Sequence, residues 1–205
     1  MFEFSVGESI EIIGDYIEKS CQSYYSLRKK NHRLELKRNN EVAFLRKGTV
    51  SAYREDNNKV TLTIEAPAIL GMAQMLHNDC LHYFRCDQDS ELFTFNKGTF
   101  INLLSEQKLW HHAFIILSHH LELYFQREKI LSQKDVSSMV KAHLEYLWKK
   151  DPVSRAKTSV YTFILARNQV SRSSLHKVMA QLTSQGLIKL INGKLVWISE
   201  DINKN

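Results

Sequence analysis

Hydroxyl and basic side chains gather in one short segment near the C-terminal end of the chain. Residues 171–181 read Ser-Arg-Ser-Ser-Leu-His-Lys-Val-Met-Ala-Gln. At helical spacing, the polar members of this segment share one face: Arg172, Ser173, His176, Lys177 and Gln181. Guanidinium and amide groups donate hydrogen bonds to base edges, and Lys and Ser bind phosphate oxygens. The chemistry that this face supports is recognition of a nucleic acid.

The other face of the same segment is apolar, which predicts a helix packed on a core. Its members are Leu175, Val178, Met179 and Leu182. Ser171 is a suitable N-cap, and Gly186 is suited to end a helix that covers Arg172–Gln185. Because the N-terminus of a helix attracts anions, we expect Ser171, Ser174 and Lys177 to hold phosphates.

The flanking sequence predicts the elements that would position this helix. We expect helices over 136–149 and 160–167, a turn at 168–170, and strands over 187–191 and 195–198. The two strands are joined by Asn192-Gly193, a pair preferred in tight hairpins. Two helices, a short turn and a hairpin predict a winged helix-turn-helix, with Lys189 and Lys194 on the wing against the DNA backbone.

The net charge of +6 is distributed unevenly along the chain. Of the 28 Lys and Arg residues, 12 lie in residues 132–205 beside only 5 Asp and Glu, a net +7. Residues 1–131 hold the other 16 basic residues against 17 acidic ones. Winged helices also serve as protein-docking modules, but a basic domain with Ser-Arg-Ser-Ser at the helix start favours double-stranded DNA.

The first hundred residues predict a different architecture. Short apolar or alternating runs, separated by turn signals, occur between Tyr24 and Phe95 and predict a sandwich or small barrel. Helices are expected at about 10–19 and 99–104. The fold class is therefore α+β.

From residue 105 to Leu131 the pattern predicts one long helix, without Pro or Gly. Its apolar stripe comprises Trp110, Phe114, Leu117, Leu121 and Tyr124. A symmetric dimer would bury both copies of this stripe at once, so we expect these residues to form a homodimer interface. The alternative is packing of the stripe on its own domain.

Several motifs resemble the CRP/FNR superfamily of bacterial transcription regulators, over nearly the whole chain. The matching segments are 44–50 and 68–71, 91–95 with Phe100, and, most specifically, 171–175 with Leu182 and 187–188. Residues 106–110 and 192–195 resemble, more narrowly, the branch named for inhibiting hydrogen peroxide resistance. The resemblance implies a cyclic-nucleotide-binding-like β-roll at 1–104, a dimerisation helix at 105–131 and a winged helix-turn-helix at 132–205. It also implies RNA polymerase as a partner, base contact by Arg172 and a link to oxidative stress.

Two departures from the superfamily concern its ligand. Cyclic-nucleotide-binding members place a Glu after the pocket glycine, whereas Met72 follows Gly71 here. Cys80-Leu81 stand where those members supply an Arg-Ser pair to the phosphate. A buried phosphate without its Arg has no partner for its charge, so we expect no cyclic nucleotide binding. The cysteine cluster of the iron–sulfur members is also missing, and we expect no cofactor.

Other candidate sites are less well supported. Adjacent histidines, as in His111-His112 and His119-His120, point about 100° apart on a helix and predict no metal site. A cupin enzyme would need a closely spaced His-x-His, but His77 and His82 are five residues apart, so we expect no enzyme and no catalytic residue.

A thiolate pair reports peroxide by forming a disulfide, which makes Cys80 and Cys86 a candidate redox switch, although each is also an ordinary core residue. The alternative function is therefore a redox- or ligand-sensing scaffold that acts through protein partners. No secretory signal and no run of eighteen apolar residues occur, so we expect a cytoplasmic protein without membrane attachment.

Overall fold

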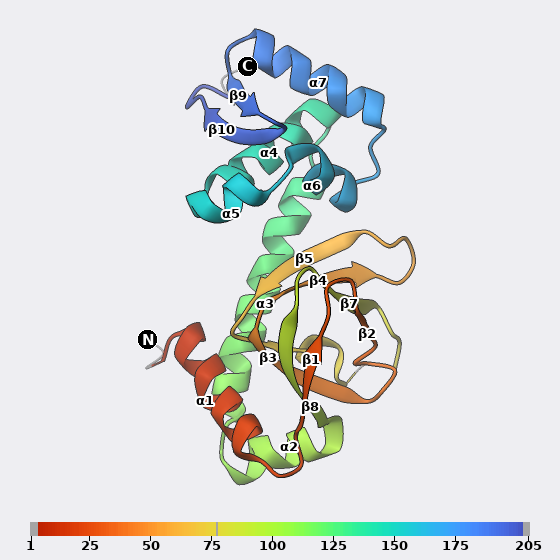
Figure 1. Ribbon diagram of the computed structural model, residues 1–205, viewed down its shortest axis with the longest axis vertical. Coiled ribbons are helices and arrows are strands. Elements are labelled where there is room, and N and C mark those ends of the chain that lie inside the picture. The colour runs from red at the N-terminus through yellow and green to blue at the C-terminus, as the bar shows by residue number, and fades with distance from the viewer. Residues whose placement is uncertain (1–3, 77, 203–205) are drawn as a thin grey trace. The chain divides into compact units, whose positions relative to one another are not determined.

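The computed structural model describes residues 4–76 and 78–202, and most of its elements are labelled in Figure 1. The chain forms two compact units, residues 1–125 and 126–205. Their boundary falls inside the long helix α3 (Trp110–Leu131), so that its last six residues count with the second unit. None of the described helices is long and apolar enough to cross a membrane.

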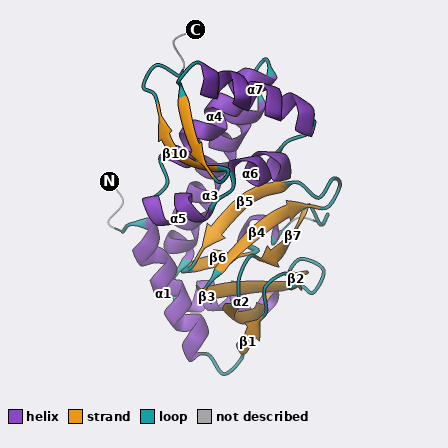
Figure 2. Cartoon of the chain, turned by 45° about the horizontal axis from the view of Figure 1, so that its top comes forward, coloured by secondary structure: helices purple, strands orange, loops and turns teal. Residues whose placement is uncertain are grey.

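The first unit contains two antiparallel sheets of four strands each, drawn as arrows in Figure 2. One has the order β1 (Tyr24–Arg28), β8 (Ser90–Asn96), β3 (Glu41–Lys47) and β6 (Ala68–Leu70). The other has the order β2 (Arg33–Leu34), β7 (His82–Cys86), β4 (Thr49–Arg54) and β5 (Val60–Glu65). Strands from both sheets bury side chains in one shared core that includes Leu45, Val50 and Leu92.

Glycine is required where the chain passes from one sheet to the other between β3 and β4. Gly48 has a φ of 110°, a conformation that side-chain-bearing residues rarely adopt. A Cβ atom at this position would meet the side chain of Ser90. The close approach of these two backbones brings the two sheets together at this turn.

Three helices cover the β1-β8-β3-β6 sheet of the first unit. They are α1 (Val6–Lys19), α2 (Lys97–Glu106) and the first part of α3. Ser5 and Glu8 form a capping box that begins α1. Ile13, Ile17 and Phe100 are fully buried in the core that these helices share with β3 and β8.

The second unit contains four helices and a hairpin. Its elements are α4 (Val136–Trp148), α5 (Pro152–Lys157), α6 (Val160–Arg167), α7 (Arg172–Ser184), β9 (Ile188–Ile191) and β10 (Lys194–Ile198). Its core combines Leu144 of α4, Ile164 of α6, Leu175 and Met179 of α7 and Leu195 of β10, each at most 2% exposed.

The predicted fold class is confirmed, and two elements went unpredicted. Residues 152–157 form α5 because Asp151 caps the N-terminus of this new helix and Pro152 occupies its first position, where the missing N–H costs nothing. The sequence predicts no helix between residues 149 and 160. The second is β7, in which Tyr83, Phe84 and Cys86 are buried between polar neighbours.

Candidate functional site

The start of α7 is held by its N-cap. The Ser171 hydroxyl accepts a hydrogen bond from the Ser174 backbone N–H at 3.0 Å and donates one to the Ser174 hydroxyl at 2.8 Å. The Ser173 hydroxyl lies 3.0 Å from that of Ser171. The predicted cap is therefore present, and the Ser171 hydroxyl that we expected to hold a phosphate is engaged within the helix start.

The two predicted faces of α7 separate cleanly in the structure. Leu175, Met179 and Leu182 are buried, and Val178 is partly buried against the same core. The polar members of the other face, Arg172, Ser173, His176, Lys177 and Gln181, are all exposed. Arg172 and Lys177 have no hydrogen-bond or ion-pair partner among the described residues. Their cationic groups are therefore available to a ligand.

Two contacts that the sequence analysis missed fix α7 against its neighbours. The ring of His176 stacks on that of Tyr161 in α6, with 4.4 Å between ring centroids. In the turn before α7, buried Asn168 donates through Nδ2 to the Ile164 carbonyl at 2.9 Å and lies 2.8 Å from Nε2 of His143. These buried polar groups hold the turn in one conformation.

The hairpin that follows α7 has the geometry of a wing. Asn192 and Gly193 have φ values of 50° and 72°, as the predicted tight turn requires. The Gly193 carbonyl accepts a hydrogen bond from the Val160 backbone N–H at 2.9 Å, which ties the turn to the start of α6. Lys189 is exposed and Lys194 is half-buried.

The first unit has a partly open cavity of about 230 Å³ between the β2-β7-β4-β5 sheet, β6 and α3. Ala52, Leu62 and Phe84 face it from one cross-strand row. Leu81 lines the cavity, whereas Cys80 does not. Among the described lining residues there is no Lys, Arg, Asp or Glu, so these residues offer a phosphate no cation. The short 3₁₀ helix η1 (Met72–Gln74), which follows Gly71, contributes Ala73 and Gln74 to the cavity lining.

The predicted dimer stripe of α3 divides into two sets. Trp110, Phe114 and Leu121 are 46%, 57% and 53% exposed. Leu117 packs on the core of its own unit, and Tyr124 lines the cavity. Leu117 lies about 60° around the helix from Phe114, and Tyr124 lies about 60° from Leu121. This rotation turns both side chains towards the sheets. Phe125, 64% exposed, continues the exposed stripe and was missed because it lies one position beyond the predicted Tyr124.

The predicted redox pair is not brought together. Cys80 precedes β7 and Cys86 is its last residue, so four strand steps from His82 already span roughly 13 Å. A disulfide needs Cα atoms within about 7 Å. Burial also raises the pKa of the Cys86 thiol, which leaves it protonated and unreactive. Both cysteines are free thiols in this structure, and the redox switch stays a prediction.

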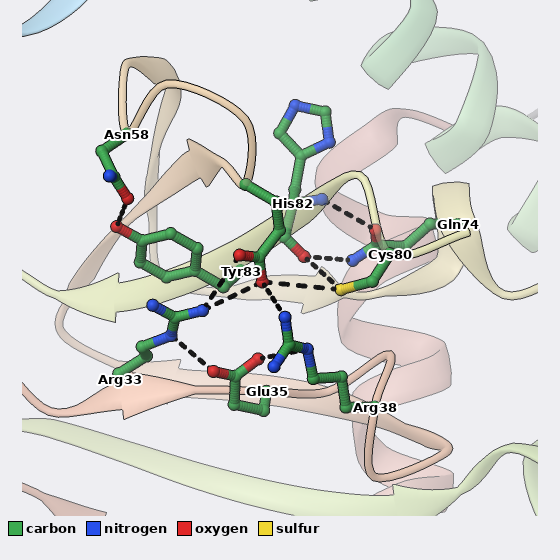
Figure 3. Close-up of polar contacts among 9 residues, drawn as sticks. Arg33, Glu35, Arg38, Asn58, Gln74, Cys80, His82 and Tyr83 are labelled. Carbon is green, nitrogen blue, oxygen red and sulfur yellow. Dashed lines mark hydrogen bonds and ion pairs between the residues drawn. The ribbon is translucent and has the colours of Figure 1, made fainter.

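Cys80 lies instead in a polar cluster shown in Figure 3. Its sulfur is 3.8 Å from Oε1 of Glu55 and 3.7 Å from the His82 carbonyl. The ligand atoms of Cys80, Glu55 and Glu35 lie within 4.8 Å of one another, as a metal site would require. Arg33 and Arg38 each form ion pairs with both carboxylates, and their two positive charges disfavour a cation there.

The histidine pairs also have roles within the fold. Nδ1 of His112 lies 3.2 Å from the Ser9 hydroxyl, and Nδ1 of His119 lies 3.7 Å from Glu122. His120 lines the cavity. His77, named in the cupin argument, lies outside the described residues.

The comparisons with known proteins agree with this geometry. Residues 137–203 match a family model described as winged helix-turn-helix DNA binding. The c-di-GMP responsive global regulator CLP of Xanthomonas campestris aligns with a TM-score of 0.72 at 14% identity, covering 92% of this chain and 99% of that one. A mutant of CooA from Carboxydothermus hydrogenoformans aligns with a TM-score of 0.69 at 14% identity, covering 100% and 95%.

The fold is that of solved regulators of the CRP/FNR type, and residues 137–203 match a winged helix-turn-helix of the DNA-binding kind. Among curated proteins, the chain is 28% identical over 163 residues to the inhibitor of hydrogen peroxide resistance of Escherichia coli (strain K12), covering 78% of each. The protein of that name from Salmonella typhimurium is 24% identical over 162 residues, again 78% of each. These similarities confirm both resemblances identified from the sequence.

The buried His143–Asn168 pair predicts a pH dependence of stability. Burial lowers the pKa of His143 to about 4, against about 6.5 in the unfolded chain. Between these values the unfolded chain binds a proton that the folded chain does not. The free energy of unfolding therefore falls as the pH is lowered from about 6.5 to 4, by about 1.4 kcal/mol per unit for this group. Urea unfolding at pH 7 and pH 5 measures this slope.

The variant His143→Gln keeps an oxygen that can accept from Asn168 but cannot take up the proton. It should therefore show a shallower slope than the wild type. His176→Gln, at an exposed position of the same unit, is the control and should keep the wild-type slope. A slope that His143→Gln leaves unchanged would exclude His143 as its source.

Proposed function

We propose that this protein regulates transcription as a homodimer that reads a specific DNA sequence through α7 and takes no cyclic nucleotide in its first unit. The observation that carries the proposal is the exposed polar face of α7 opposite an apolar face that packs on the core. Such a helix reaches the major groove with the side chains of its first turns.

Arg172 is assigned to base recognition. It occupies the first residue of α7, is exposed, and can pair with both acceptors on the major-groove edge of guanine. Lys177 and the wing residues Lys189 and Lys194 are assigned to phosphates, where contacts are independent of sequence. Ser173, His176 and Gln181 complete the groove-facing set, with His176 supported by Tyr161. Ser174 and the N–H groups at the helix start favour a nearby phosphate.

A second copy of this chain is the proposed occupant of the exposed stripe on α3. Trp110, Phe114, Leu121 and Phe125 fall within about 60° around the helix axis. An apolar stripe so narrow and continuous is suited to the same stripe of a second α3. Dimerisation would also place two copies of α7 on half-sites about one turn of DNA apart.

We also propose that the first unit responds to a signal other than a cyclic nucleotide. Cys80 lies in an ion-pair cluster outside the cavity. Leu81 contributes an apolar side chain to the cavity lining. Desolvating a phosphate there without a cation would be costly. Relatives named for hydrogen peroxide resistance support a role in oxidative stress. RNA polymerase is the proposed protein partner, and the bacterial cytoplasm the proposed location, since the target is chromosomal DNA.

Substitution of Arg172 separates base recognition from backbone binding. Arg172→Ala should lower the preference for the selected site over random DNA by about 10- to 100-fold, because a bidentate contact to a base contributes about 1–3 kcal/mol of discrimination. Lys194→Ala should weaken binding to both DNAs alike and reduce the salt dependence. Competition gel shifts at two salt concentrations measure both effects. Equal losses of preference in the two variants would contradict the assignment.

Substitution on the exposed stripe tests the dimer. Leu121→Lys should convert the dimer into monomers, because it places a charge on each side of an apolar interface. Leu27→Lys is the matched control, since Leu27 is 55% exposed on β1 and Leu121 is 53% exposed. Light scattering after size exclusion gives the mass of each. A wild-type monomer at micromolar concentration, or a dimer that survives Leu121→Lys, would refute this interface.

Calorimetric titration tests the loss of nucleotide binding. Cyclic AMP and cyclic GMP should give no saturable heat with the wild-type protein, because the cavity lacks a partner for the cyclic phosphate. Leu81→Arg introduces a cation into the cavity lining and serves as the comparison, in which weak binding of the cyclic phosphate is expected. Submicromolar binding by the wild type would show that the phosphate finds another partner.

A further inference from the structure

We infer that the cavity of the first unit binds a small, uncharged, largely aromatic or aliphatic molecule, with the imidazole of His120 as its polar contact. The inference deepens the proposal that this unit takes no cyclic nucleotide, and it rests on that proposal for the exclusion of phosphate. It names the chemical class of molecule that the unit accepts.

The walls of the cavity decide the class of ligand. Most described lining side chains are aliphatic or aromatic, and Leu62, Ala52 and Phe84 lie side by side on β5, β4 and β7. Pockets with such walls bind apolar ligands and orient them with a few polar groups. A charged ligand would lose its hydration without gaining a counter-ion from these walls.

The volume sets an approximate size. The cavity measures about 230 Å³. An apolar cavity of about 150 Å³ in another protein binds benzene, so the space here is suited to a molecule of about two fused rings. Ala52 contributes to this room, since it is the small residue between Leu62 and Phe84 in the cross-strand row.

The polar groups of the wall differ in their availability. The Gln74 amide is engaged with the backbone of His82, donating to its carbonyl at 3.0 Å and accepting from its N–H at 3.3 Å (Figure 3). Nε2 of His82 lies 3.0 Å from the Thr61 hydroxyl. Neither ring nitrogen of His120 has a hydrogen-bond partner among the described residues. His120 is therefore the group of the wall most available to a ligand.

The protonation state of His120 suits an uncharged partner. Burial lowers its pKa to about 4, with a smaller contribution from His119. At neutral pH the ring is therefore an uncharged imidazole that offers one donor and one acceptor. Such a ring accepts from a hydroxyl or donates to a carbonyl, and it gives no ionic attraction to an anion.

Three matched probes test the inference by equilibrium dialysis against the full-length protein: 2-naphthol, naphthalene and 2-naphthoate. We expect saturable one-site binding of 2-naphthol, weaker binding of naphthalene, which lacks the hydroxyl, and binding of 2-naphthoate at least tenfold weaker than that of 2-naphthol. No saturable binding of 2-naphthol, or equal binding of 2-naphthoate, would overturn the inference.

Variants locate the site. His120→Leu should weaken 2-naphthol about tenfold and leave naphthalene unchanged, because it removes one hydrogen bond and keeps the wall apolar. His119→Leu, one position along α3 and outside the cavity lining, should change neither. Ala73→Trp places a bulky ring from an exposed position into the cavity and should abolish binding of both. Binding that survives Ala73→Trp, or a 2-naphthol affinity that His120→Leu does not change, would place the ligand elsewhere.

The outcomes also separate this inference from the proposed function. Failure of 2-naphthol to bind, with cyclic AMP still inactive and DNA still bound, overturns the inference alone. Tight binding of cyclic AMP overturns the proposal on which it rests.

Discussion

The burial of one face of α7 is the interaction on which the DNA-binding surface depends. Leu175, Met179 and Leu182 are held in the core of the second unit. Since successive helical residues are about 100° apart, this burial alone determines that Arg172, His176 and Lys177 face outward. The Ser171 cap and the buried Asn168 side chain then fix where the helix begins. The outward position of the residues that we propose contact bases is therefore a consequence of packing, to which the described structure adds only the stacking of His176 on Tyr161.

The first unit shows the complementary case, in which a core was left incomplete. The sheets and α3 bury most of their apolar side chains, but a small residue, Ala52, stands where a larger one would fill the space. Leu81 lines this apolar space, whereas the neighbouring Cys80 contacts Glu55 in a cluster of ion pairs that also includes Arg33, Arg38 and Glu35.

Local sequence patterns correctly predicted the features that depend on interactions between residues close together in the chain. The cap, apolar stripe and terminating glycine of α7, and the Asn192-Gly193 turn, act within a few residues and are present as expected. Contacts between distant residues were not predictable in this way. No spacing rule brings His143 to Asn168, or His120 to the strands that share its cavity. Six residues of separation likewise did not show that the chain leading to Cys86 is an extended strand.

We propose that the packing of α7 creates a surface that recognises a specific DNA sequence. Genomic DNA sheared to short fragments, retained by the purified protein at moderate salt and sequenced, tests it most directly, with Arg172→Ala as the parallel sample. We expect the wild type to enrich a shared motif with two half-sites whose centres lie about 10 base pairs apart, and Arg172→Ala not to enrich it. Retained fragments without a shared motif, or the same motif from both samples, would contradict it.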